Sequence, residues 1–518
     1  MTEPVPETGG SYTEGIIGQP RYVNPVLSSV NEVDEDIVTL VYAGLTGHTG
    51  DGRLTDRLAD RIEVSEDGKR YTAHIRETAR FHDGEPVLAD DVVFTVSLIQ
   101  DPAYRSPLRQ VWQGVDAHAE DDRTVVFELS KPYFGFREHL SVGILPKHVW
   151  QDISAERFPL ADANLMPVGA GPYRFFDYEK DTYGNIISYK LRAFHDYFDG
   201  EPYITEFSFE FYQDEDGLVA AYGNGNRGLL GMSPLSIEKA SEFFGRPGTT
   251  IREFRVPRLF AVFLNPVKSV PLGYAEVRKA LTLATDRERI VDEVFSGHAT
   301  AVRTPFLPFM EGNPDIPDVP EDVTEANRVL DEAGWTRGGG GIREKDGVRL
   351  SFRLSVPDWP ELRNTADRLA VEWAEIGVET EVDVRPISEL SKDVIRPREY
   401  DALLYGEEMN IDPDFYSFWH SSEKEDPGSN FALFGDGDAD DLLLSLREET
   451  DPEKRREKFG AFLRILAEKY PAIFLYTPDV LYPVSDTVEG WDLSSAKRVS
   501  SRFVGAEKWY VRTKRVFR

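Results

Sequence analysis

The chain has 518 residues, a formal net charge of −32 and a pI near 4.7. Binding to nucleic acid or to an anionic membrane surface depends on clustered Lys and Arg, so this charge disfavours both partners. The absence of cysteine excludes disulfides, thiolate metal sites and cysteine nucleophiles.

In the first half of the chain, the pattern is mixed α/β. Residues 1–11, rich in Pro, Glu, Thr and Gly, predict a flexible leader without a signal-peptide pattern. This leaves two interpretations: a cytoplasmic protein, or one whose targeting segment is missing. Apolar runs and turn residues then predict helices at 37–45 and from 89 onward, a turn at 82–84, a Gly/Pro joint at 167–176, and strands near 70–76, 124–129, 186–192 and 204–212.

The second half is richer in helices. A strand at 349–356, a helix at 360–376 and a strand at 378–385 form a β-α-β rhythm, followed by a strand at 400–405. Further helices are predicted at 271–294, 325–333 and 452–469. Strand-rich segments at 186–262 and 480–518 flank this helix-rich part. The pattern therefore predicts discontinuous domains joined by at least two chain crossings, as in hinged two-lobed binders.

Most catalytic and cofactor motifs are absent or out of context. Residues 223–228 match GxGxxG, but a dinucleotide site needs a preceding strand, and the preceding segment is predicted to be helical. We therefore interpret this motif as a helix-terminating turn. The chain has no HExxH and no GxSxG, and its histidines are scattered. His82, in FHDG, is interpreted as a turn residue packed on a sheet.

The segment GEEMNIDPDFYSFWHSS, residues 406–422, is the strongest candidate for a binding site. Pro413 cannot continue a helix, so we expect a loop after the strand at 400–405 and a helix from about Phe415. Tyr416, Trp419 and His420 then share one helix face. This face belongs either to the core or to a ligand cleft, because apolar rings with polar tips suit both.

Several segments in order resemble the extracytoplasmic solute-binding proteins of ABC transporters, family 5, the dipeptide-, oligopeptide- and nickel-binding group. The first is AGLTGHTGDGRLTDRLADRIEVSEDGKRYTAHIRETARFHDGEPVLADDVVFT. PVGAGPYRF, VRKALTLATDRERIVDEVFSGHA, AGW at 333–335, IDPDFYSFWHSS and NFALF follow. The resemblance covers nearly the whole chain from about Tyr12.

This resemblance implies an α/β fold of the periplasmic-binding-protein type (class II, cluster C), with two hinged lobes. Domain I would comprise 12–48, 172–262 and 482–518, domain II 49–171, and domain III 263–481. The ligand would lie between domains I and III. The residues expected to bind it are Asn24, Asn265, Tyr405, Glu407, Glu408, Met409, Asn410, Asp412, Tyr416, Trp419, His420 and Asn430.

The implied function is capture of peptides outside the cytoplasm and delivery to the transmembrane permease subunits of an ABC importer. The protein would be an anchored or periplasmic monomer with no cofactor, no metal and no catalysis. Alternatives are a receptor for a non-peptide solute, a sensor or chaperone-like binder of the same fold, and a hydrolase with an unrecognised acid pair. Nickel is disfavoured because His420 has no evident histidine partner.

One position departs from the pattern of the peptide-binding members. Their aspartate that pairs with the peptide amino group aligns with Met409 here. Either Glu407 or Glu408 supplies the missing charge, or the ligand has no free amine at this place.

Overall fold

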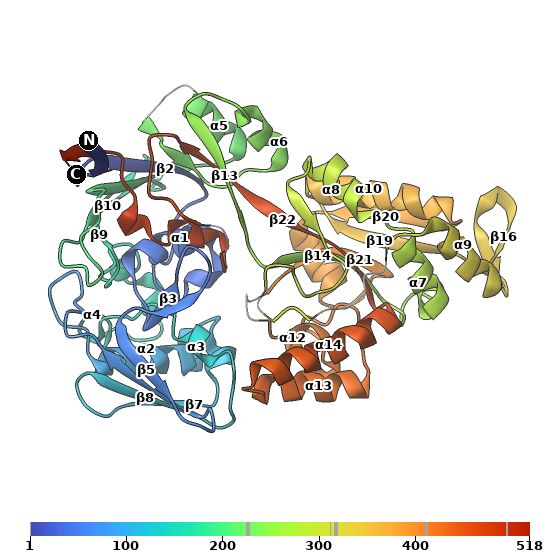
Figure 1. Cartoon of the computed structure of the whole chain (residues 1–518), viewed down its shortest axis with the longest axis horizontal. Coiled ribbons are helices and arrows are strands. Elements are labelled where there is room, and N and C mark those ends of the chain that lie inside the picture. Colours follow the sequence, from blue (N-terminus) through green and yellow to red (C-terminus); the bar gives the residue numbers. More distant parts are fainter. Residues whose placement is uncertain are drawn as a thin grey trace. The chain divides into compact units, whose positions relative to one another are not determined.

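The protein is described by a computed structural model that covers residues 2–223, 228–310, 312–314, 320–409, 413–493 and 496–517 (Figure 1). The chain forms two compact units: unit 1 contains Met1–Val256 and Val480–Arg518, and unit 2 contains Pro257–Asp479. Unit 2 is thus a continuous insertion into unit 1. Predicted domains I and II both fall largely within unit 1, and their separation at residues 49–171 stays a prediction.

Unit 1 contains two main sheets. The larger has the strand order β22-β12-β2-β11-β10-β9, with β13 beside β22, and the smaller has the order β5-β6-β8-β7. The larger sheet comprises β2 (Ser11–Ile17), β9 (Tyr173–Lys180), β10 (Ile186–Ala193), β11 (Glu206–Tyr212), β12 (Gly231–Met232), β13 (Thr249–Arg255) and β22 (Ala472–Ser485). The smaller comprises β5 (Ala59–Val64), β6 (Arg70–Ile75), β7 (Val115–Ala119) and β8 (Thr124–Leu129).

Helices and short strand pairs complete unit 1. Its helices are α1 (Glu32–Val41), α2 (Ala89–Gln100), α3 (Phe136–His139), α4 (Lys147–Trp150), α5 (Glu215–Gly223) and α6 (Ile237–Ala240). The short pairs are β3 (Thr46–His48) with β4 (Leu54–Asp56), and β1 (Thr2–Pro6) with β23 (Thr513–Phe517). The expectation of a flexible leader at 1–11 is therefore wrong for β1, because its backbone pairs antiparallel with β23.

A buried ionic cluster joins distant segments of unit 1; it consists of Tyr12, Glu14, Asp36, Tyr482 and Arg502. The Arg502 guanidinium donates to both carboxylate oxygens of Asp36 at 2.6 Å and to Glu14 at 3.3 Å. Glu14 also accepts from the hydroxyls of Tyr12 and Tyr482. All five residues are buried. Burial raises the pKa of both carboxyls, even though Arg502 acts in the opposite direction.

Unit 2 is built on one sheet with the order β20-β19-β21-β14-β22, with β15 also beside β22. Its strands are β14 (Arg258–Leu264), β15 (Ala299–Ala301), β19 (Ser351–Pro357), β20 (Glu379–Arg385), β21 (Ala402–Glu408) and part of β22. The short strands β16 (Thr336–Arg337), β17 (Arg343–Lys345) and β18 (Val348–Arg349) form a separate small sheet.

Helices cover both faces of this sheet (Figure 1). Strand β14 is buried on both sides, because Phe260, Val262 and Leu264 face one core cluster while Leu259, Ala261 and Phe263 face the other. The first cluster contains residues of α7 (Ala275–Leu283), α8 (Arg287–Phe295), α9 (Val323–Glu332) and α10 (Pro360–Glu375). The second contains residues of α11 (Ile387–Leu390), α12 (Tyr416–Trp419), α13 (Gly437–Glu448) and α14 (Pro452–Lys469).

The predicted mixed α/β pattern is confirmed, with one break in the predicted helix at 271–294. This segment forms two helices, α7 and α8, because the Asp286 side chain caps the second by accepting from Arg289 N at 2.9 Å. Within the described ranges, no helix has the length and apolar character needed to cross a membrane. The GxGxxG segment follows α5 directly, but residues 224–227 lie outside the described residues.

His82 has the structural role predicted for it. Its Nε2 lies 3.0 Å from the Gly171 carbonyl oxygen, and Gly169 N donates to its Nδ1 at 3.2 Å. Burial lowers the pKa of His82 to about 4. The imidazole is therefore neutral at physiological pH and holds the loop that contains Gly169 and Gly171.

Candidate functional site

The carboxyl ends of three parallel strands of unit 2 meet at one edge of the sheet. Strand β19 pairs in parallel with both β20 and β21, and the three end at Pro357, Arg385 and Glu408. Ligands of open α/β sheets bind outside the carboxyl ends of the strands. This edge is therefore the candidate site, and it contains part of the segment 406–422.

Glu407, near the end of β21, is a buried carboxyl group with no hydrogen-bond partner for either oxygen among the described residues. Its side chain lies on the same face of β21 as Tyr405 and Met409, which belong to an apolar cluster. Burial raises the pKa of Glu407 well above its ordinary value. An unpaired buried carboxylate is costly, so the site is suited to a cationic partner.

Glu408 points to the opposite face and already has such a partner. Its Oε1 accepts from Nε of Arg258 at 3.0 Å and also from Nη2 of the same guanidinium. Arg258 lies on β14, where it is the register partner of Glu408. The pair joins residues 150 positions apart, so no local sequence pattern reveals it.

Met409, where the resemblance leads us to expect the amine-binding position, is buried in the apolar cluster of unit 2. Its backbone N donates to the Pro257 carbonyl oxygen at 2.7 Å. A thioether has no charge to offer an amine. The three neighbouring side chains are those of Glu407, Glu408 and Met409. Of these, only Glu407 has an ionisable carboxyl group whose oxygens have no hydrogen-bond partner among the described residues.

Tyr416, the first residue of α12, and His420, which follows its last residue, form a stacked pair. Their ring centroids are 4.2 Å apart with an interplanar angle of 20°. The Arg447 guanidinium lies over the Tyr416 ring at 3.9 Å, and His420 Nδ1 lies 2.8 Å from the Ser422 hydroxyl. The prediction that both side chains lie on one helix face is wrong for His420, because this residue follows the last residue of α12, although the two rings do lie together; both residues are partly exposed.

Trp419 does not share this partly exposed position. Its side chain is fully buried, with ring centroids 5.7 to 6.4 Å from those of Phe474, Phe434 and Phe263. Helix α12 has only four residues, and His420 already has extended backbone angles. The expectation that Trp419 contacts the ligand is therefore corrected: its side chain belongs to the core.

We predict that Trp419→Ala destabilises unit 2 by about 3–5 kcal/mol, because truncation leaves a large cavity between three aromatic rings. The measurement is the urea-induced unfolding transition followed by circular dichroism. Tyr416→Ala, a truncation at the half-buried end of the same helix, should cost less. An unchanged midpoint for Trp419→Ala would contradict this role.

The three predicted asparagines are buried and hold loops. Asn24 Nδ2 donates to Oδ1 of Asn164, Asn265 accepts from backbone N–H groups of residues 267 and 268, and Asn430 donates to carbonyls of residues 419, 420 and 434. Their polar atoms are thus used within the protein. Asn410 and Asp412 lie outside the described residues.

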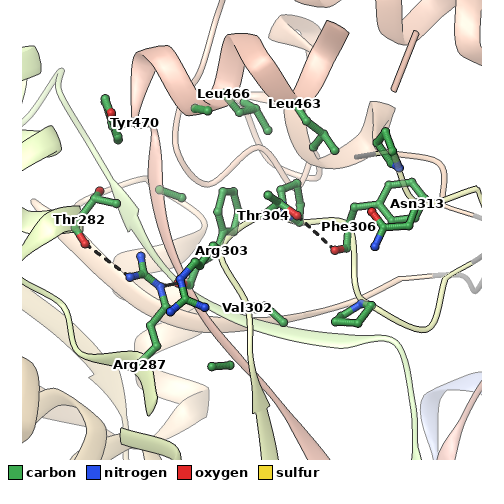
Figure 2. A pocket seen from close by; sticks show the side chains of 17 residues that line it. Thr282, Arg287, Val302, Arg303, Thr304, Phe306, Asn313, Leu463, Leu466 and Tyr470 are labelled. Atoms are coloured by element: carbon green, nitrogen blue, oxygen red, sulfur yellow. Dashed lines mark hydrogen bonds between the residues drawn. The ribbon is translucent and has the colours of Figure 1, made fainter. Parts of the chain in front are cut away.

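A separate pocket of unit 2 has a volume of about 360 Å³ (Figure 2). The Arg287 guanidinium, which lines it, is buried and donates to the carbonyl oxygens of Phe474 at 2.6 Å and Thr285 at 3.1 Å. Thr282, Arg303, Thr304, Phe306, Asn313, Leu463, Leu466 and Tyr470 also line it. None of the ten predicted ligand-binding residues that the structure describes contributes to this lining.

Comparisons with known proteins agree over nearly the whole chain. It is 27% identical over 522 residues to the oligopeptide-binding protein AppA of Bacillus subtilis, covering 98% of this chain and 92% of that protein. It is 30% identical to protein XP55 of Streptomyces lividans, covering 93% and 86% of the two chains.

Solved structures show the same fold. The structure of AppA from B. subtilis in complex with a nonapeptide has a TM-score of 0.76 at 26% identity, covering 98% of this chain and 99% of that one. CtaP of Listeria monocytogenes, an ABC transporter substrate-binding protein, has a TM-score of 0.85 at 24% identity, covering 97% and 99%. The α/β fold expected from the resemblance is thus confirmed as that of periplasmic binding proteins.

A family model, described as bacterial extracellular solute-binding proteins, family 5, matches residues 53–429. This match covers more than half of the chain. The protein therefore belongs to family 5 of the bacterial extracellular solute-binding proteins.

Proposed function

We propose that this protein is an extracytoplasmic receptor that captures peptides and delivers them to the permease of an ABC importer, without changing them chemically. Relatives that match over 92% or more of this chain are named as oligopeptide-binding and dipeptide-binding proteins. The family description, extracellular solute-binding proteins, supports the location. We further propose that the protein acts as a monomer and needs no cofactor.

The observation that carries the peptide assignment is Glu407. Its carboxyl group has no described hydrogen-bond partner, although it is buried at the carboxyl end of β21. The ammonium group at the start of a peptide has the charge and the N–H donors that this carboxylate needs. We therefore assign the role of the missing aspartate to Glu407. The ion pair with Arg258 argues against Glu408 in the same role, because that carboxylate already has a cationic partner.

We predict that a mixture of tripeptides to pentapeptides with free amino termini raises the melting temperature, because ligand that binds only the native state stabilises it by mass action. The measurement is differential scanning fluorimetry. Native mass spectrometry of protein purified from the producing cells would identify any ligand that stays bound.

The matched control is the same mixture with acetylated amino termini, which removes the positive charge but keeps the side chains. This mixture should give little or no shift. A shift with sugars or metal chelates, and none with either peptide mixture, would contradict the peptide proposal. Equal shifts with free and acetylated peptides would contradict only the proposed role of Glu407 and would leave the peptide proposal standing.

A further inference from the structure

Trp359 is the most exposed tryptophan of the chain. Its side chain is 43% exposed, whereas Trp491 is half-buried and the other six are buried. Its backbone is fixed, because Trp359 N donates to the Pro357 carbonyl oxygen at 2.8 Å and its own carbonyl accepts from Arg363 N at 2.9 Å. The indole makes no capping hydrogen bond to α10, which begins at Pro360. An exposed tryptophan side chain on a fixed backbone is typical of a contact surface.

This tryptophan lies at the same sheet edge as Glu407. It follows β19 directly, and β19 pairs in parallel with β21 through the partners Leu354–Ala402 and Ser355–Leu403. Trp359 lies two residues past the end of β19, and Glu407 lies one residue before the end of β21, so both lie at the carboxyl ends of neighbouring strands. Neighbouring strands are about 4.8 Å apart, and one extended peptide residue spans about 3.4 Å. A peptide whose amino group is at Glu407 therefore reaches Trp359 with its second or third residue.

The charged groups around Trp359 are already neutralised by one another. Arg363 pairs with Asp358, and Arg385 pairs with Asp383 at 2.8 Å. Arg258 pairs with Glu408 on β21. These pairs neutralise the guanidinium groups nearest to Trp359, and the carboxylates of Glu389 and Asp393 also act on Arg385. Such a surface favours an apolar or aromatic side chain over a charged one.

We propose that Trp359 is a specificity-determining residue that contacts an apolar, preferably aromatic, side chain at the second or third position of the bound peptide. The inference rests on the proposed function, because it takes the peptide amino group to be at Glu407. It adds the ligand subclass: peptides with a free amino terminus and a large apolar side chain next to it.

The test compares two pairs of tripeptides by isothermal titration calorimetry: Ala-Phe-Ala with Ala-Gly-Ala, and Ala-Ala-Phe with Ala-Ala-Gly. Wild-type protein should prefer the phenylalanine peptide of at least one pair by about tenfold, as expected for a buried aromatic contact. Trp359→Ala should reduce this preference to less than about twofold and leave the glycine peptides nearly unaffected. Trp359→Phe should keep most of the wild-type preference for the phenylalanine peptide.

Val371→Ala is the matched control, because Val371 is 55% exposed on the same helix, more than two turns from Trp359. Fluorescence gives a second measurement: acrylamide should quench Trp359 in the free protein, and the phenylalanine peptide should protect it. The inference is overturned if Trp359→Ala keeps the preference, or if it weakens the binding of all four peptides equally. In both cases the proposed function stands. If wild-type protein binds none of the four peptides, the proposed function fails and the inference fails with it.

Discussion

Peptide affinity is expected to fall by on the order of 100-fold when Glu407 is replaced by glutamine, because the ammonium group of the proposed ligand would then lack its buried counter-charge. Isothermal titration calorimetry with a free-amino peptide measures this loss. Glu408→Gln is the matched control. Its carboxylate sits one residue further along β21 but is exposed and paired with Arg258, so the change should cost less than about fivefold.

The same substitution should stabilise the empty protein. Burial raises the pKa of Glu407 in the folded state, so its favourable contribution is fully present below the unfolded pKa of about 4.5 and is lost as the pH rises through the folded pKa. Glutamine does not ionise. The melting temperature of Glu407→Gln should therefore match that of wild type near pH 4 and exceed it increasingly at higher pH.

Proton exchange provides an independent measurement of this role. Binding of an ammonium group lowers the pKa of Glu407 again, so wild-type protein should release protons when a peptide binds near neutral pH. Calorimetry in phosphate and in Tris buffer quantifies this release. Glu408→Gln should keep the release and Glu407→Gln should abolish it. Unchanged affinity and unchanged proton release in Glu407→Gln would place the amine elsewhere.

Replacement of Arg502 by methionine is expected to cost about 3–5 kcal/mol of unfolding free energy in unit 1, because it leaves two buried carboxyl groups without their cation. The groups that face Arg502 are Glu14, Asp36 and the Tyr482 side chain of the buried ionic cluster. The urea-induced unfolding transition measures the loss. Arg328→Met, which removes an exposed guanidinium on α9, is the control and should change stability by less than about 1 kcal/mol.

The loss should depend on pH in a defined direction. Without Arg502, the pKa values of Glu14 and Asp36 in the folded state are raised further above their unfolded values. The variant therefore regains stability as the pH falls towards about 4.5, where protonation removes the unpaired charges. A deficit that stays constant between pH 8 and pH 5 would show that Arg502 contributes mainly through packing.

Much of the secondary structure could be predicted from local patterns. Helix α14 and strand β8 have the predicted bounds, because an Asp-Pro start and a run of β-branched and aromatic residues are local signals. The break between α7 and α8 was missed although Asp286 is a good N-cap residue, because the apolar periodicity continues across it. The pairing of β1 with β23 joins the two ends of the chain, and no local pattern encodes such a contact.

The candidate site was predicted less completely. Periodicity placed Tyr416, Trp419 and His420 together but could not tell which ring faces the core, and the short α12 buries only Trp419. The choice between Glu407 and Glu408 depends on Arg258, which is distant in the sequence. Trp359 was missed, although a tryptophan between a predicted strand and a helix-starting proline is a usable signal.

Strand β22 has a consequence for how such a chain can arise. Its residues up to Asp479 belong to unit 2 and those from Val480 to unit 1. The chain enters unit 2 at Pro257, directly before β14, and leaves it along β22. Because β14 and β22 pair with each other, the two ends of the inserted segment lie on adjacent strands. A segment whose ends are neighbours can be gained, lost or exchanged as a cassette with little disturbance of its host. Residues 257–479, which carry the proposed ligand contacts Glu407 and Trp359, can therefore be exchanged as one unit by recombination as well as changed by point substitution.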